Sequence, residues 1–173
     1  DPLRRLGARP DCLTDPRWLT GFEQIAAAGL TWDLLVYDAQ IPDATELLRS
    51  VPDTPIVLEA ACWPLDLSPD GFSRWVDHLE FAAAHPNVAL KLQGLALLFG
   101  PSREATEPWV RRAVATFGAQ RCMFATHLPV DGLLWSVDDL VGTLAAVLAD
   151  LTAAERAAFF TGCARRQYGL PAG

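Results

Sequence analysis

The sequence predicts an α/β fold in which parallel strands alternate with helices along the chain. Short apolar runs alternate with longer stretches whose apolar residues recur at helical spacing. Pro and Gly mark the breaks at fairly even intervals, which is typical of βαβ units. A chain of 173 residues is long enough to bury one core, so we expect a single domain over residues 1–173.

Five runs are predicted as strands because each is short, mostly apolar and bounded by turn residues. They are residues 3–6 (LRRL), 31–37 (TWDLLVY), 55–60 (PIVLEA), 88–93 (VALKLQ) and 121–126 (RCMFAT). The last run places one polar side chain, His127, at its end before Pro129 prevents further pairing. The sequence therefore raises the question of what His127 does.

Six stretches between these runs are predicted as helices from their amphipathic pattern and their end signals. Ser68 before Pro69 is typical of a helix start, and Thr152 three residues before Glu155 forms a capping box. The predicted helices are residues 16–28, 42–50, 68–84, 102–117, 137–148 and 152–160. Strands joined in this way form either an open sheet or a closed barrel, and the pattern alone does not choose.

Composition and charge argue against two classes of partner. The formal net charge of −7 opposes binding to nucleic acid, and no cluster of Lys and Arg with aromatic residues offsets it. No apolar run approaches the roughly 20 residues that span a bilayer. The cysteines Cys12, Cys62, Cys122 and Cys163 lie far apart without a zinc-finger spacing, so we expect reduced thiols and a cytoplasmic location.

Six short motifs lie in order along the whole chain, at residues 3–6, 28–34, 40–42, 86–94, 117–129 and 162–170. They match, in the same order, the patterns G-V-R-R-L, A-G-L-T-F-D-L, Q-L-P, P-N-V-x-x-K-L-S-G, F-G-x-D-R-L-M-F-G-S-D-W-P and G-N-A-x-R-F-Y-G-L. With these motifs the chain resembles the amidohydrolase-2 hydrolases, in particular the sugar-lactonase branch that includes L-fuconolactonase-like proteins. The order and spacing of these matches are specific, although each motif alone is short.

The resemblance implies a (β/α)8 TIM barrel with its active site at the carboxyl ends of the strands. It also implies that the barrel is incomplete here, because the family's first strand, with two metal ligands in H-x-H, and its second strand have no counterpart. The family's reactive positions are substituted as well: a metal-facing His is Ala60, a metal-binding Asp is His127, a Ser is Gln93 and an Asn is Cys163. We therefore expect no metal and no other cofactor.

Two residues are predicted as catalytic. His127 is a candidate general base, oxyanion partner or ligand, and a hydrogen-bonded structural histidine is an equal alternative. Lys91 is the only lysine of the chain. It lies in a predicted strand, where a buried ion pair with Asp33 is favoured over a reactive amine.

Four residues are predicted to bind substrate, each with a packing or solvent-exposed alternative. Tyr37 and Gln93 are candidate hydrogen-bond donors, Trp63 a candidate pocket wall, and Arg4 a candidate partner for a carboxylate. Strand alternation in the family frame places Glu59 on the outward face, as a carboxylate behind the site. The predicted inward residues are Asp33, Leu35, Tyr37, Ile56, Leu58, Ala60, Ala89, Lys91, Gln93, Met123, Ala125 and His127.

Two functions are compatible with these features. The first is a divergent, metal-independent hydrolase, descended from a lactone, ester or amide hydrolase, that acts on a small oxygenated molecule with His127 as its acid or base. The second is a catalytically inactive binding or regulatory subunit. In either case the open barrel edges predict a homodimer or a second chain that covers them.

Overall fold

The computed structural model describes residues 12–171 and contains one parallel sheet in the order β1-β2-β3-β4. The strands are β1 (Trp32–Leu34), β2 (Ile56–Leu58), β3 (Val88–Leu92) and β4 (Cys122–Phe124). Four of the five predicted strands are confirmed, although β1 is shorter than residues 31–37. The predicted strand at residues 3–6 lies outside the described residues.

The helices follow the predicted order with two additions. They are α1 (Pro16–Ala27), α2 (Thr45–Ser50), α3 (Pro69–Ala83), α4 (Leu95–Phe99), α5 (Arg103–Phe117), α6 (Val137–Val147), α7 (Ala153–Ala157) and α8 (Cys163–Tyr168). The sequence did not predict α4 or α8, and a π-helical turn over Ala158–Gly162 joins α7 to α8. The predicted caps are present, because Ser68 accepts from the amide of Gly71 and Thr152 forms its capping box with Glu155.

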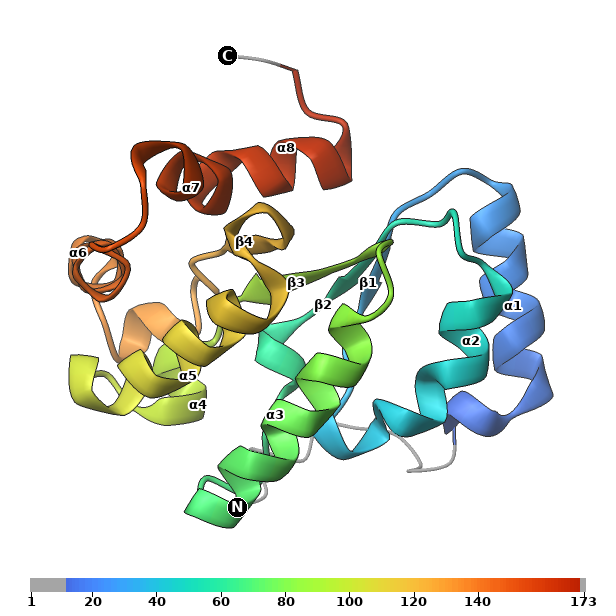
Figure 1. Ribbon diagram of the computed structural model, residues 1–173, viewed down its shortest axis with the longest axis horizontal. Coiled ribbons are helices and arrows are strands. Elements are labelled where there is room, and N and C mark those ends of the chain that lie inside the picture. The colour runs from blue at the N-terminus through green and yellow to red at the C-terminus, as the bar shows by residue number, and fades with distance from the viewer. Residues whose placement is uncertain (1–11, 172–173) are drawn as a thin grey trace.

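The two faces of the sheet are covered by different helices. Helices α3 and α5 pack on one face, where Ile56, Leu58, Leu90 and Leu92 join the main apolar core. Helix α8 lies near β4 on the other side of the sheet, as Figure 1 shows in red. There Cys163 packs against a second, smaller core of Val57, Ala89 and Met123.

The strand register corrects the predicted inward face. Asp33 is opposite Val57, Val57 is opposite Ala89, and Lys91 is opposite Met123. Paired residues of neighbouring parallel strands share a face, so Val57 faces the same side as Asp33 and Lys91. The prediction that Ile56 and Leu58 face this side is therefore wrong by one residue.

The structure also bears on membrane insertion and on the state of the cysteines. No helix within residues 12–171 is long and apolar enough to cross a membrane. Cys62, Cys122 and Cys163 are buried free thiols, and burial raises the pKa of each. These thiols act as small apolar core residues.

Candidate active site

A group of charged and polar side chains lies at the carboxyl ends of β1, β2 and β3. Lys91 Nζ donates to Asp33 Oδ2 at 2.8 Å and to Glu59 Oε1 at 2.6 Å. The side-chain amide of Gln93 donates to the second oxygen of Glu59. The predicted ion pair between Lys91 and Asp33 is confirmed, and Glu59 is a second partner. The placement of Glu59 on the outward face was wrong, because β2 faces the opposite way from the predicted alternation.

Lys91 is held as an ammonium ion. Its side chain is 12% exposed and that of Glu59 is 11% exposed. Burial would lower the pKa of Lys91, but its hydrogen bonds to Asp33 and Glu59 outweigh burial and raise the pKa above the usual range for lysine. Lys91 is therefore a fixed positive charge and is not poised to react as a neutral amine.

The two carboxylates respond differently to the same ammonium group. Burial raises the pKa of Glu59, and the hydrogen bond from Lys91 only partly offsets it. Burial also acts to raise the pKa of Asp33, but hydrogen bonds from Lys91 and Tyr168 outweigh it and lower the pKa. Asp33 is thus the firmly ionised member of the pair, and Glu59 is the member that takes up a proton more readily.

Tyr168 joins this group from α8, although no role was predicted for it. Its hydroxyl donates to Asp33 Oδ1 at 2.7 Å, and Lys91 Nζ lies 5.1 Å from the centre of its ring. Burial raises the pKa of Tyr168 to about 12. The available signal was the match of residues 162–170 to a family motif, but that match did not show which strand α8 contacts.

His127 lies three residues after β4 in a second polar group. Its Nδ1 is 3.2 Å from Oδ1 of Asp131, a buried carboxylate that the sequence did not single out. The ring also lies against Gly94, because a Cβ on Gly94 would be 3.5 Å from Nδ1. Gln93 belongs to the Lys91 group and directly precedes Gly94, so adjacent residues after β3 belong to one group and border the other.

Tyr37 and Trp63 form a separate aromatic pair beyond the ends of β1 and β2. Their rings meet edge to face with centres 6.5 Å apart, and Trp63 is only 4% exposed. Trp63 ends a turn in which four successive residues, from Ala60 onward, have positive φ angles of 38° to 59°. Trp75 Nε1 braces this turn by donating to the carbonyl of Ala61 at 2.8 Å. Tyr37 and Trp63 thus pack together near the carboxyl ends of the strands.

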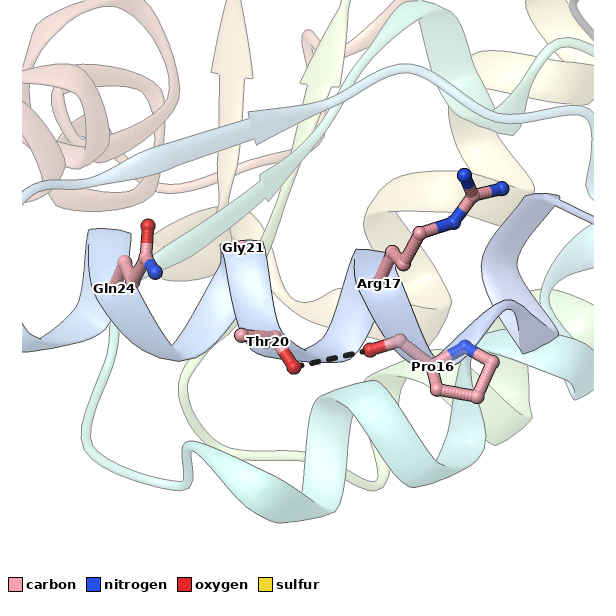
Figure 2. A pocket seen from close by; sticks show the side chains of 5 residues that line it. All are labelled: Pro16, Arg17, Thr20, Gly21 and Gln24. Atoms are coloured by element: carbon pink, nitrogen blue, oxygen red, sulfur yellow. Dashed lines mark hydrogen bonds between the residues drawn. The ribbon is translucent and has the colours of Figure 1, made fainter.

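A hollow of about 350 Å³ lies along α1, away from these polar groups. Figure 2 shows its lining, which comes entirely from one helix and includes a hydrogen bond from Thr20 to the carbonyl of Pro16. The hollow contains none of the predicted site residues; it is lined by Pro16, Arg17, Thr20, Gly21 and Gln24. The remaining predicted residue, Arg4, lies outside the described residues.

Comparison with known proteins agrees with this arrangement. Residues 5–170 match the amidohydrolase family Amidohydro_2. The chain belongs to this amidohydrolase family. It is 34% identical to the uncharacterised protein y4mH of Sinorhizobium fredii, over 87% of this chain and 51% of that protein. It is 32% identical to an L-fucono-1,5-lactonase of Burkholderia multivorans, over 91% of this chain and 57% of that protein.

A solved amidohydrolase shows how the sheet relates to a complete barrel. The structure, from Burkholderia multivorans with bound zinc, superposes with a TM-score of 0.86 at 29% identity, over 98% of this chain and 63% of that one. The four-stranded sheet is therefore part of an amidohydrolase TIM barrel, as predicted. The chain spans about half the length of the curated relatives it matches.

The zinc in that relative raises the question of whether the residues of this chain fit a metal ion. Ala60 has no ligand atom in its side chain, and one oxygen of Asp33 and one of Glu59 accept hydrogen bonds from Lys91. No group of three or more His, Cys, Asp or Glu side chains within residues 12–171 could hold a metal. A zinc site needs three or four such ligands, so the donor set of the described residues does not fit zinc.

Proposed function

We propose that this amidohydrolase chain opens a lactone, or a related ester or amide, of a small oxygenated molecule without a metal ion. Family membership and two relatives named L-fucono-1,5-lactonase support the hydrolase class. The observation that carries the proposal is the imidazole of His127 at the strand ends, where Nδ1 is bonded to Asp131. No described residue forms a hydrogen bond with its Nε2, and the side chain is 22% exposed, so water can reach the ring.

In the proposed reaction, Nε2 of His127 removes a proton from water while the water oxygen bonds to the acyl carbon. The π electrons of the carbonyl group move to its oxygen and give a tetrahedral oxyanion. When the ring C–O bond breaks, the imidazolium returns its proton to the leaving oxygen. One lactone and one water thus give one hydroxy acid, and the imidazole is restored.

Neighbouring residues position the substrate in this proposal. The amide of Gln93 is held by Glu59 one residue before Gly94, on which the His127 ring lies. A fixed amide beside the base suits hydrogen bonding to the hydroxyl groups of a sugar lactone. Lys91 holds Glu59 in place through its positive charge. In this proposal the same charge attracts the oxygen atoms of the substrate, and the amine itself does not react.

The test is hydrolysis of L-fucono-1,5-lactone, with a panel of sugar lactones and simple esters, by chelator-treated protein. We expect acid release above the buffer rate, and a loss of about 100-fold or more in kcat/KM for His127→Ala. His85→Ala is the matched control, because His85 contacts Phe81 away from the strand ends. We expect the melting temperature of His127→Ala to stay close to that of the wild type. Activity only with added zinc, or unchanged activity of His127→Ala, would contradict the proposal.

A second candidate is a binding or regulatory subunit whose barrel is completed by other strands. β1 and β4 each pair on one side only within residues 12–171. Unpaired parallel edges favour a second copy or another chain. Sedimentation at low micromolar concentration tests the partner, and a stable compact monomer would contradict it. Lactone binding measured by calorimetry, weakened in His127→Ala and without turnover in the wild type, would favour this candidate over the hydrolase.

A further inference from the structure

The carboxylate of Asp131 is buried beside His127 without a cationic side chain bonded to it in the described part of the chain. Its side chain is 2% exposed. An ionised carboxylate is costly to bury unless hydrogen-bond donors surround it. The donors here are backbone amides of the first turn of α4: Ala96 N at 3.2 Å from Oδ2 and Leu97 N at 3.4 Å from Oδ1.

We propose that Asp131 is a positioning residue that holds the neutral ring of His127 with its proton on Nδ1 and its lone pair on Nε2. A carboxylate that accepts from two amides has only acceptor capacity left for the imidazole. The Nδ1 atom, 3.2 Å away, must therefore donate to it. The catalytic step proposed for His127 needs this tautomer, so the activity part of the inference depends on the proposed function.

The backbone also holds the two side chains in this relation. The amide of Asp131 donates to the carbonyl of His127 at 3.1 Å, which closes the chain between them into a turn. Gly94 also borders the ring, because a Cβ built on it would lie 3.5 Å from Nδ1, an ordinary van der Waals distance. The ring is thus oriented by its hydrogen bond to Asp131 and by the turn that joins the two residues, which is how a general base is aligned.

A purely structural role for Asp131 is the competing explanation, because its carboxylate also caps α4. The substitution Asp131→Asn separates the two roles. In the position of Oδ2, the carbonyl oxygen of Asn can still accept from the amide of Ala96, so the shorter of the two cap hydrogen bonds is kept. Its NH₂ group then takes the position of Oδ1, where the 3.4 Å contact with Leu97 N is given up and only donation to Nδ1 of His127 is possible, which moves the ring proton to Nε2.

The experiment is nitrogen-15 NMR of the histidine rings in the full chain, with His127→Ala used to assign the signals of His127. We expect a protonated Nδ1 in the wild type and a protonated Nε2 in Asp131→Asn. Asp43→Asn, an exposed carboxylate-to-amide change, is the control and should leave the tautomer unchanged. A wild-type ring protonated on Nε2, or an unchanged tautomer in Asp131→Asn, would overturn the inference.

The kinetic part uses L-fucono-1,5-lactone or whichever lactone of the panel the wild type hydrolyses. A wrong tautomer should lower kcat by about 10²- to 10⁴-fold with little change in KM. An unchanged kcat in a variant whose tautomer has reversed would show that Asp131 does not act through His127. If the wild type hydrolyses none of the panel, the proposed function fails, while the NMR result still decides whether Asp131 sets the tautomer.

Discussion

Replacing Lys91 by Met tests whether the ammonium ion holds the strand-end carboxylates together. The change keeps most of the apolar volume of the side chain and removes its charge. Glu59, whose side chain is 11% exposed, then keeps its hydrogen bond from Gln93 but no cationic partner within residues 12–171. The side chain of Asp33 is 41% exposed and keeps its hydrogen bond from Tyr168. Water and the phenol therefore replace much of the interaction that Asp33 loses with Lys91.

The expected cost follows from these exposures. Breaking a buried ion pair costs about 3–5 kcal/mol, whereas a pair with an exposed member contributes about 0.2–1 kcal/mol. The variant can avoid a buried, unpaired charge by protonating Glu59. Protonating a glutamate whose ordinary pKa is about 4.3 costs about 3.7 kcal/mol at pH 7, which sets an upper limit on the loss. We therefore expect Lys91→Met to lower the free energy of unfolding by about 3 kcal/mol at pH 7.

Two comparisons separate this explanation from a simple packing defect. Lys91→Met with Glu59→Gln should recover about 2 kcal/mol, because no unpaired charge remains. Burial already raises the pKa of Glu59 in the folded protein. The folded state therefore favours the protonated form of this residue, and its contribution to stability is greatest below the pKa it has in the unfolded chain. The single variant should therefore lose less stability at pH 5 than at pH 7. Urea unfolding followed by circular dichroism gives these values. A loss below about 1 kcal/mol at pH 7, or no recovery in the double variant, would refute the reasoning.

Two other predictions concern strain and alkaline pH. Ala61→Gly should cost at least about 1 kcal/mol less than Ala113→Gly in urea unfolding, because both residues are buried but only Ala61 has a positive φ. Equal losses would show that the turn is unstrained. The pKa of Tyr168 is raised to about 12, so its contribution to stability is complete below about pH 10 and is lost as the pH rises toward 12. Tyr168→Phe should therefore show a shallower fall in stability between pH 10 and 12, and an unchanged slope would contradict this.

The order of the elements was predictable from the sequence because it depends on local signals. Each strand run is bounded by turn residues, and the N-caps Ser68 and Thr152 form the predicted hydrogen bonds. The extent of pairing was less predictable. β1 covers only Trp32–Leu34 because it pairs with β2, which itself covers only Ile56–Leu58. Strand length is set by the neighbouring strand, which the local sequence does not contain.

The residues of β2 do not show which of its side chains point to which face of the sheet. Ile56, Val57 and Leu58 are all fully buried, because helices cover one face and the small core around Met123 covers the other. A strand buried on both faces shows no alternation of apolar and polar residues. The family frame was therefore applied one residue out of step, and Glu59 was assigned to the wrong side. The register with Asp33 shows the correct side.

Residues that reach the site from distant elements were also missed. Tyr168 lies 135 positions after Asp33, and Asp131 lies in the loop after β4 while its amide donors come from α4. Nothing in the spacing of these residues indicates contact, since α4 itself was not predicted. The sequence signal for His127 was a single polar side chain at the end of an apolar run, and its catalytic role stays a prediction.

The two polar groups differ in how they relate to the family. Asp33 and Lys91 match the T-F-D-L and K-L-S-G motifs, and their ion pair is therefore compatible with the ordinary family scaffold. His127 and Ala60 stand where the family motifs have a metal-binding Asp and a metal-facing His. If the chemistry changed while the scaffold was kept, the change should lie at the positions where this sequence differs from the family motifs. The Lys91–Asp33 ion pair thus lies at positions that match the motifs, whereas the proposed metal-independent activity rests on His127 and Asp131.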